Sequence, residues 1–416
     1  MPLRFLITLF FIAAAEIYSF ILVRSVVRNM PQSLRLGLMS IYIAITLLAW
    51  LSIFFFRKID WAHLPHGARN IYIAFTIGFF VGKLLILAVM LIDDIRRIFL
   101  WLILKYFPAT DTSFASKTGD GITRSVFLKR VALVLGGVAI GGFLYGVTNR
   151  YRYQLKRVKL SFPNLPASFK GLKIVQVSDI HSGSFDNEHA VKHGIEMVLK
   201  EKPDLIFFTG DLVNNKAEEV KPYMHIFSML QAPMGVYSTL GNHDYGDYVQ
   251  WESQQAKQEN LEELKSIHGK MGWKLMMNEH VILEKNGEKI AVVGIENWSA
   301  KANFPKYGDM KKAYEGLREK NIPFKILLSH DPSHFDAQVT PDYKDIDLTL
   351  SGHTHGMQFG IEIPGFKWSP VKYVYKKWAG LYKTGSQYLY VNRGYGFLGY
   401  PGRLGILPEI TVFELS

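Results

Sequence analysis

KIVQVSDIH, residues 173–181, is a short run of apolar and β-branched residues that ends in an aspartate and a histidine. β-Branched side chains favour strands, and the change to polar residues marks the end of a strand. The same arrangement recurs along the chain, in apolar runs that each stop at a polar cluster: 205–209, 236–240, 326–329 and 348–351. Helix-like stretches separate these runs, at 188–200, 217–230, 252–271 and 309–320. Alternating strands and helices predict a layered α/β domain.

The polar clusters contain side chains that bind metal ions. They supply Asp179, His181, Asp211, Asn242, His330, His353 and His355, with His243 and Asp244 beside them. In open α/β sheets, ligands bind outside the carboxyl ends of the strands, where all five clusters would meet. Oxygen and nitrogen donors suit Zn, Mn or Fe, and the absence of cysteine excludes thiolate sites and a Cys nucleophile. One cluster alone is weak, because Gly-Asp after a strand is usually a turn. Five in one order predict a shared metal site.

The spacing within two clusters suggests how the ligands are arranged. In an extended chain, Asp179 and His181 point the same way, so one metal can be held by both. His353 and His355 allow the same geometry. The glycines around them also permit a turn that directs the two rings to different metals.

The N-terminal part of the chain predicts a membrane domain. Three apolar stretches of about 20 residues, the length that spans a hydrocarbon core of about 30 Å, lie at 3–23, 36–56 and 71–92. A fourth stretch, 131–147, is shorter and rich in glycine, which lets helices approach closely. A cleaved secretory signal is the alternative for the first stretch, but its basic n-region is thin and more spans follow. We predict an all-α transmembrane bundle over 1–147, a linker over 148–170 and a catalytic domain over 171–416.

The net charge of +12 belongs to the membrane half. Residues 1–157 hold 19 Lys/Arg and 6 Asp/Glu, whereas residues 158–416 hold 29 and 30. The second half therefore lacks the basic excess of a nucleic-acid-binding domain, and we expect no nucleic-acid partner. Within the membrane half, Glu16 and Lys83 interrupt two apolar stretches, and they either face the bundle interior or mark a functional site such as a transport path.

Loop charges predict the orientation of the chain, because basic residues in short loops mark the cytoplasmic side. The loop after the third stretch is strongly basic, with Arg96, Arg97, Lys105, Lys117, Arg124, Lys129 and Arg130. The fourth stretch would then exit the cytoplasm, although Arg57 and Lys58 in the second loop depart mildly from this rule. We predict a multi-pass protein of the inner membrane with an extracytoplasmic catalytic domain.

The five polar clusters together resemble the calcineurin-like metallophosphoesterases, and a membrane-anchored bacterial subgroup in particular. The resemblance covers residues 170–416 and includes every block in order. Residues 390–394 and 401–403 resemble the subgroup's tail, whereas Met357 stands where a second glycine is common. The resemblance implies a four-layer α/β-β/α sandwich, in which two central mixed sheets are flanked by helices.

The same resemblance implies two divalent metal ions, of Mn, Zn or Fe. It assigns the first metal to Asp179, His181, Asp211 and His355. It assigns the second metal to Asp211, Asn242, His330 and His353, so that Asp211 bridges the pair. A hydroxide between the metals would attack phosphorus, and His243 would protonate the leaving oxygen while Asp244 orients its ring. Arg393 and Arg403 are candidates for substrate phosphate contacts, or equally for structural ion pairs.

The substrate is the least determined property. Residues 364–380 combine aromatic side chains with lysines, the composition of an interfacial membrane contact, although a hairpin packed on the domain has equal support. We expect a phosphoesterase acting on a membrane-associated or envelope phosphate ester, lipid-linked esters included, with monoester and diester cleavage both open. The alternatives are the same chemistry on soluble nucleotides or phosphometabolites, and a non-catalytic metal-bound scaffold. Every metal position and His243 are present, which favours an enzyme.

Overall fold

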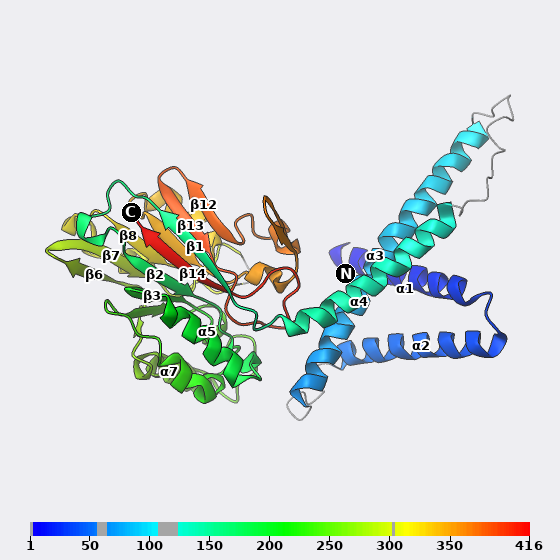
Figure 1. The fold of residues 1–416 in the computed structure, drawn as a ribbon, viewed down its shortest axis with the longest axis horizontal. Coiled ribbons are helices and arrows are strands. Elements are labelled where there is room, and N and C mark those ends of the chain that lie inside the picture. The colour runs from blue at the N-terminus through cyan, green and yellow to red at the C-terminus, as the bar shows by residue number, and fades with distance from the viewer. Residues whose placement is uncertain (1–2, 56–64, 107–123, 302–303) are drawn as a thin grey trace. The chain divides into compact units, whose positions relative to one another are not determined.

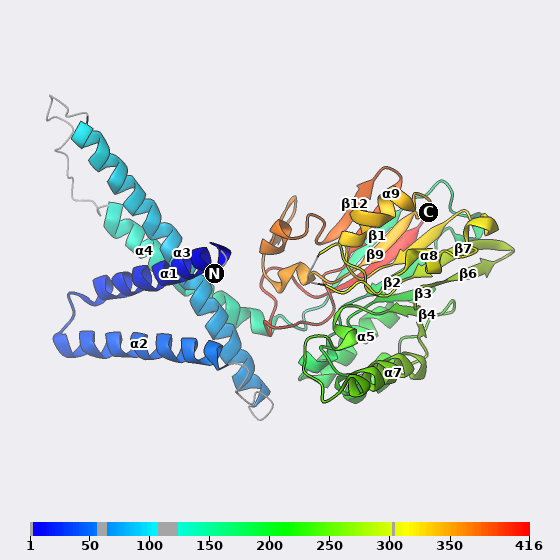
Figure 2. The ribbon, with the colours of Figure 1, turned by 180° about the vertical axis from the view of Figure 1, so that it is seen from behind.

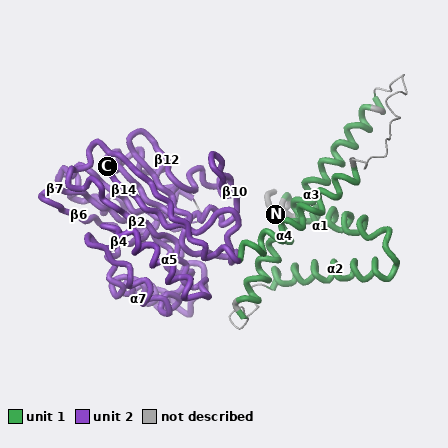
Figure 3. Tube along the Cα trace, in the orientation of Figure 1, with its two compact units in different colours: residues 1–147 green, residues 148–416 purple. Residues whose placement is uncertain are grey.

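The computed structural model describes residues 3–55, 65–106, 124–301 and 304–416. The chain divides into two compact units, residues 1–147 and 148–416, which are described one at a time (Figures 1 and 3). Three basic loop residues used in the orientation argument, Arg57, Lys58 and Lys117, lie outside the described residues.

The described part of the first unit is helical. Its helices are α1 (Leu3–Val27), α2 (Gln32–Phe54), α3 (His66–Tyr106) and α4 (Arg124–Thr148). Each of these helices is long and apolar enough to cross a membrane. The third helix runs well past residue 92, where the predicted stretch ends, because residues 98–104 continue the apolar sequence without a helix breaker.

Polar and small side chains join these helices. Lys83 Nζ lies 2.6 Å from Glu16 Oε2, and the Trp50 indole donates to Glu16 Oε1 at 2.9 Å. The two charges inside the bundle are therefore paired, as the cost of a lone charge in hydrocarbon requires. Between α3 and α4, a Cβ on Gly82 would lie 2.9 Å from the carbonyl oxygen of Gly136. This contact confirms that glycine in the fourth stretch permits close packing.

Two mixed sheets form the centre of the second unit (Figures 1 and 2). The first sheet has the order β1 (Gln154–Leu160), β14 (Glu409–Leu415), β2 (Lys173–Val177), β3 (Leu205–Thr209), β4 (Val236–Thr239) and β5 (Lys274–Leu275). The second has the order β12 (Gly380–Thr384), β13 (Gln387–Val391), β9 (Leu348–Ser351), β8 (Lys325–Leu328), β7 (Glu288–Gly294) and β6 (Glu279–Lys285). In the first sheet β2, β3 and β4 run parallel, and in the second β7, β8 and β9 do, so their carboxyl ends share an edge in each sheet.

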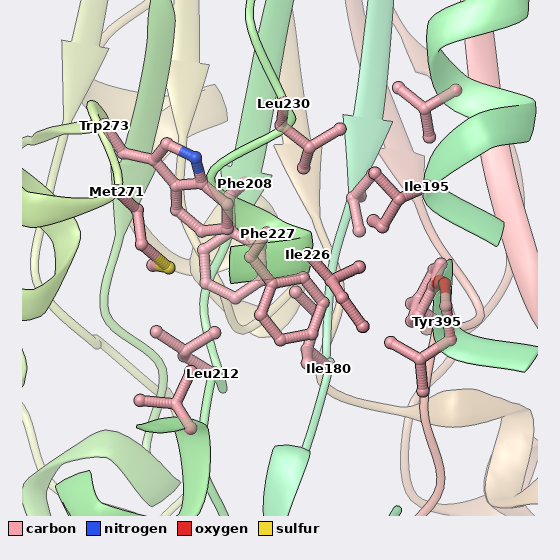
Figure 4. Packing of buried hydrophobic residues seen from close by; sticks show 14 of the residues in the cluster. Ile180, Ile195, Phe208, Leu212, Ile226, Phe227, Leu230, Met271, Trp273 and Tyr395 are labelled. Carbon is pink, nitrogen blue, oxygen red and sulfur yellow. The ribbon is translucent and has the colours of Figure 1, made fainter. Parts of the chain in front are cut away.

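The side chains of these strands alternate between two cores. In β2, Ile174 packs in the cluster between the sheets, whereas Val175 packs in the cluster under α5 (Glu188–Lys200) and α7 (Gln254–Lys270). Figure 4 shows the cluster under the helices, where Phe208 of β3 meets Phe227 and Trp273. A third cluster joins the second sheet to α8 (Met310–Ala313) and its neighbours. Three cores between four layers confirm the predicted sandwich.

The predicted linker over 148–170 is wrong for most of its length. Residues 154–160 form β1, which pairs in parallel with the edge of β14 from Gln154 to Leu160. Leu160, Phe162 and Phe169 are buried in the cluster between the sheets. The polar, proline-containing sequence suggested an extended connection, but its apolar residues complete the core instead.

Candidate metal centre

The seven predicted ligand residues come together in two groups. They follow the carboxyl ends of β2, β3, β4, β8 and β9, and the side chains of His353 and His355 are slightly exposed whereas the others are fully buried. Ligand atoms of Asp179, His181 and His355 lie within 4.8 Å of one another. Those of Asp211, His330 and His353 do so as well. His353 and His355 therefore belong to different groups, the second of the two arrangements that their spacing allowed.

Asp211 stands between the groups. Its Oδ2 lies 3.1 Å from His330 Nε2 in its own group and 3.6 Å from His181 Nε2 in the other. Asn242 joins the second group, because its Oδ1 lies 2.8 Å from His353 Nδ1. One carboxylate oxygen thus faces histidines of both groups, which is the position expected of a bridging ligand.

Several ligand atoms at this site are buried without a hydrogen-bond partner among the described residues. They are Asp179 Oδ2, His181 Nδ1, His181 Nε2, His330 Nε2 and His355 Nε2. A buried polar atom without a partner costs about 1–3 kcal/mol, so proteins rarely retain several in one place. A cation in each group would satisfy all of these atoms except one nitrogen of His181, since a metal binds a single ring nitrogen, and the residues therefore fit a metal pair.

The hydrogen bonds of two histidines leave one ring nitrogen for a metal. The Thr209 carbonyl lies 2.6 Å from His330 Nδ1 and can only accept, so Nδ1 carries a proton, and Nε2 is the nitrogen where a cation could take the place of a proton. The Tyr375 hydroxyl donates to Asp331 Oδ2 at 3.1 Å and accepts from His353 Nε2 at 2.9 Å. The lone pair of His353 Nδ1 then faces the Asn242 oxygen. Two such acceptors repel each other unless a cation lies beside them.

Burial sets the charge of the histidines. It lowers the pKa of His181 to about 3 and the pKa of His355 well below its usual value, so both rings are neutral donors at neutral pH. Burial would lower the pKa of His330 too, but the Asp211 carboxylate outweighs it and raises that pKa to about 10. Burial also raises the pKa of Asp179 to about 7. A bound cation would compete with the protons on His330 and Asp179.

Five of the seven ligand residues have a left-handed backbone conformation. The φ angles of Asp179, His181, Asp211, His353 and His355 are 50°, 50°, 60°, 70° and 50°. A left-handed conformation is uncommon for residues other than glycine, and such residues gather at functional sites. The expectation that Asp179 and His181 share a metal from an extended chain is therefore wrong in its geometry. Consecutive tight turns, not strand alternation, bring the two side chains together.

His243 lies beside the ligands, but Asp244 does not orient it. The His243 ring is 5.0 Å from the His181 ring, and its Nδ1 lies 2.8 Å from the carbonyl oxygen of Asn214. Asp244 is buried and accepts backbone N–H bonds from four residues: Asp211, Leu212, Val213 and Gly241. The prediction that Asp244 orients the His243 ring is therefore wrong. Asp244 ties together the loops after β3 and β4, since its two oxygens are fully used there.

Arg393 and Arg403 are not placed to contact substrate. Arg393 is buried in ion pairs with Glu362, at 2.8 Å, and with Glu409. Arg403 is fully buried and donates to backbone carbonyls, including that of Arg393 at 2.7 Å. Its Nη2 also lies 3.2 Å from His355 Nδ1. Both arginines therefore make structural contacts, the second of the two alternatives given for them, because neither has an exposed face left for a phosphate.

Sequence reasoning missed the residues that hold the ligand rings. A backbone carbonyl, such as those of Thr209 and Asn214, carries no signal in the sequence. Tyr248, whose hydroxyl accepts from Asn242 Nδ2 at 2.9 Å, lies six residues from its partner and no motif marks it. Tyr375 belongs to the aromatic stretch 364–380, which suggested a membrane contact and not a bond to a ligand histidine.

Comparison with known proteins agrees with this geometry. Residues 172–357 match the family model for calcineurin-like phosphoesterases. A metallophosphoesterase of Bacillus subtilis, YkuE, is 32% identical over 71% of this chain and 98% of its own length. The chain belongs to the calcineurin-like metallophosphoesterase family. This metallophosphoesterase is a hydrolase of phosphoric esters, and its two His/Asp groups are candidate sites for the divalent metals of the family.

The first unit also has relatives. Residues 3–150 match a model for the transmembrane domain of probable calcineurin-like phosphoesterases, so this metallophosphoesterase is a membrane protein. A transmembrane protein with a metallophosphoesterase domain from Danio rerio is 30% identical over 66% of this chain, which spans 60% of that protein. The UDP-2,3-diacylglucosamine pyrophosphatase LpxG of Chlamydia trachomatis is 28% identical over 58% of this chain and 83% of its own length. Among solved structures, Haemophilus influenzae NAD nucleotidase aligns with a TM-score of 0.38 and 17% identity, over 54% of this chain and 45% of its own.

Proposed function

We propose that this metallophosphoesterase uses two divalent metal ions, of Mn, Zn or Fe, to hydrolyse a phosphate ester of a membrane-associated molecule. The observation that carries the proposal is the pair of buried His/Asp groups with Asp211 between them. Asp179, His181 and His355 would hold one ion, and Asn242, His330 and His353 the other. Asp211 would bridge the two.

The chemistry divides between the metals and the chain. A bound metal pair supplies a hydroxide nucleophile at neutral pH and neutralises charge on the phosphoryl oxygens. The Asn214 carbonyl accepts from Nδ1 of His243, so Nε2 is the nitrogen that would act as the acid: a ring protonated at both nitrogens gives its Nε2 proton to the leaving oxygen and becomes neutral. Thr209 and Tyr375 hold the rings of His330 and His353 in place. No Ser or Cys nucleophile is needed.

Two observations support a membrane-associated substrate. The catalytic unit shares its chain with helices that are apolar and long enough to cross a membrane, so the site is tethered near the bilayer. The match to LpxG covers 83% of the length of that protein. LpxG is named for a substrate that carries two acyl groups and a pyrophosphate. Together they favour a lipid-linked phosphate ester over a soluble nucleotide.

Replacing Asp211 tests the metal pair. Asp211→Asn keeps the shape of the side chain but removes the charge that two cations would share, so we expect it to lose most bound metal and at least 100-fold in turnover, about 2.7 kcal/mol. Metal content and hydrolysis are measured on the same purified full chain. Glu315→Gln, at an exposed position, serves as the matched charge control. An Asp211→Asn protein with full metal content and activity would sink the proposal.

We further propose that the catalytic unit faces the extracytoplasmic side of the inner membrane, as the basic loop after the third span suggests. The chain has no cysteine, so single cysteines report sidedness cleanly. Lys285→Cys in intact cells should react with a thiol reagent that cannot cross the inner membrane. Reaction only after lysis would reverse the orientation.

A further inference from the structure

A two-stranded hairpin in the second unit has its apolar face outward. The hairpin pairs β10 (Ile361–Ile363) with β11 (Phe366–Trp368), and in its register Ile361 lies opposite Trp368 and Ile363 opposite Phe366. These four side chains share one face, because strand side chains alternate. Ile361, Ile363 and Phe366 are 49%, 58% and 53% exposed. A surface hairpin normally turns such residues toward the core.

The opposite face of the hairpin is polar and turned toward the domain. Glu362 pairs with the buried Arg393 at 2.8 Å, and Lys367 donates to the carbonyl of Ala379. The inverted pattern is therefore fixed by polar contacts that are partly buried. It is not a strand that has slipped by one residue, since a slip would break both contacts.

The segment after the hairpin repeats this division between an anchored and an exposed face. Val371, Tyr375 and Trp378 are buried in a cluster of their own with Ala379 and Ile406. Tyr373 and Val374 lie between them in the chain and are 75% and 57% exposed. Residues 364–380 thus pack on the domain with one side, as one of the two predicted alternatives states, and leave apolar side chains exposed on the other side.

Exposed apolar side chains concentrate in this one part of the unit. Among the described residues of the second unit, nine large apolar side chains are exposed, and seven of them fall within residues 357–381. These seven, which we name the apolar lip, are Met357, Ile361, Ile363, Phe366, Tyr373, Val374 and Leu381. Exposed lysines, Lys372 and Lys376, adjoin them in the chain. Clustered apolar surface with neighbouring lysines is the composition of a contact with anionic membranes.

The apolar lip adjoins the metal centre. Met357 follows the ligand His355 by two residues, and Tyr375, between the exposed Val374 and Lys376, hydrogen-bonds the ligand His353 at 2.9 Å. A lipid whose acyl chains meet the lip would hold its phosphate close to these histidines.

We propose that the apolar lip inserts into the interfacial layer of an anionic bilayer and receives the acyl part of a lipid phosphate whose headgroup reaches the metal centre. This inference rests on the proposed function and specifies its substrate class. The bilayer is the occupant because the chain carries its own membrane spans and because exposed lysines adjoin the lip, whereas the one acidic residue within it, Glu362, is paired with Arg393.

The test measures insertion without relying on activity. The full chain is placed in nanodiscs of phosphatidylethanolamine and phosphatidylglycerol, with a nitroxide on Ile363→Cys or, as control, on Lys285→Cys. We expect the label at 363 to collide more with lipid-soluble oxygen than with an aqueous nickel chelate, and the label at 285 to show the reverse. A label at 363 as accessible to nickel as that at 285 would overturn the proposal. A label shielded from both reagents would do the same, since protein would then cover the lip.

A pair of double variants tests the link to substrate. Ile363→Glu with Phe366→Glu should lower hydrolysis of phosphatidate in vesicles by about tenfold while leaving a soluble aryl phosphate within about twofold. Ile363→Leu with Phe366→Leu keeps the surface apolar and should retain both activities. Equal losses on both substrates in the glutamate variant would contradict the lip as a lipid contact. A protein inactive on every phosphate ester would refute the proposed function, whereas the nitroxide result would still decide insertion.

Discussion

His243 illustrates what a single residue contributes at the site. Its backbone N–H donates to Asp211 Oδ1 at 2.9 Å, and its ring is held through Nδ1 by the Asn214 carbonyl. The sequence motif predicted that this histidine lies beside the metals. It did not predict the partner of the ring, because a main-chain carbonyl is the same in every sequence and only the fold brings it near. The adjacent Asp244, chosen by proximity in the chain, points to backbone amides instead.

The role of His243 as a proton donor predicts a dependence on the leaving group. His243→Ala should keep its metal and lose about 10²–10⁴-fold in turnover on alkyl phosphates, which leave as strongly basic alkoxides. The loss should be small for p-nitrophenyl phosphate, whose leaving group needs no proton. Steady-state rates on both esters check this, and uniform losses across leaving groups would argue for a binding role.

His268 predicts part of the acid sensitivity of the fold. Burial lowers its pKa to about 3, and its Nδ1 lies 2.9 Å from the Ser238 hydroxyl. Between pH 6.5 and 3 the unfolded chain binds a proton here that the folded chain does not, so the free energy of unfolding falls as pH falls, by about 1.4 kcal/mol per unit. His268→Gln should flatten the decline in melting temperature over this range. Parallel curves for the two proteins would contradict this assignment.

At the scale of elements, the sequence predicted the strands that carry the ligands and the helices α5 and α7, but it missed the other strands of both sheets. Short runs rich in β-branched residues that end in polar clusters correspond to β2, β3, β4, β8 and β9. The helix expected over 217–230 is instead a 3-10 segment and a short helix, because Pro222 interrupts it. The helix expected over 309–320 is cut short near Gly316, whose φ is 66°. The left-handed turns at the ligands follow from the closure of the site, and no local pattern in the sequence marks them.

Close packing between elements predicts which glycine matters. A Cβ on Gly396 would lie 1.8 Å from the Ile180 carbonyl oxygen, between the ligands Asp179 and His181. Gly396→Ala should therefore cost about 1–3 kcal/mol and reduce metal content, because backbone must move. At Gly269, in the last turn of α7, a Cβ meets nothing, so Gly269→Ala should leave the melting temperature unchanged or raised. Equal behaviour of the two variants would remove the argument.

For the whole molecule, hydropathy and charge predict a membrane part followed by a hydrolase part, and the chain forms two compact units, residues 1–147 and 148–416. The boundary region was mispredicted, because β1 supplies an edge strand whose partner, β14, lies more than 240 residues away in sequence. Pairing over such a distance leaves no local pattern. The second unit carries an exposed apolar surface, the apolar lip, in a chain that also has membrane-spanning helices. Such a surface suits a catalytic unit that is held at a membrane.

Anomalous X-ray scattering from crystals of the metal-loaded full chain tests the central claim most directly. Data collected at the absorption edges of Mn, Fe and Zn locate each ion and identify it. We predict two peaks, one against Asp179, His181 and His355 and the other against Asn242, His330 and His353, with Asp211 touching both. A single peak, or peaks away from these residues, would contradict the account.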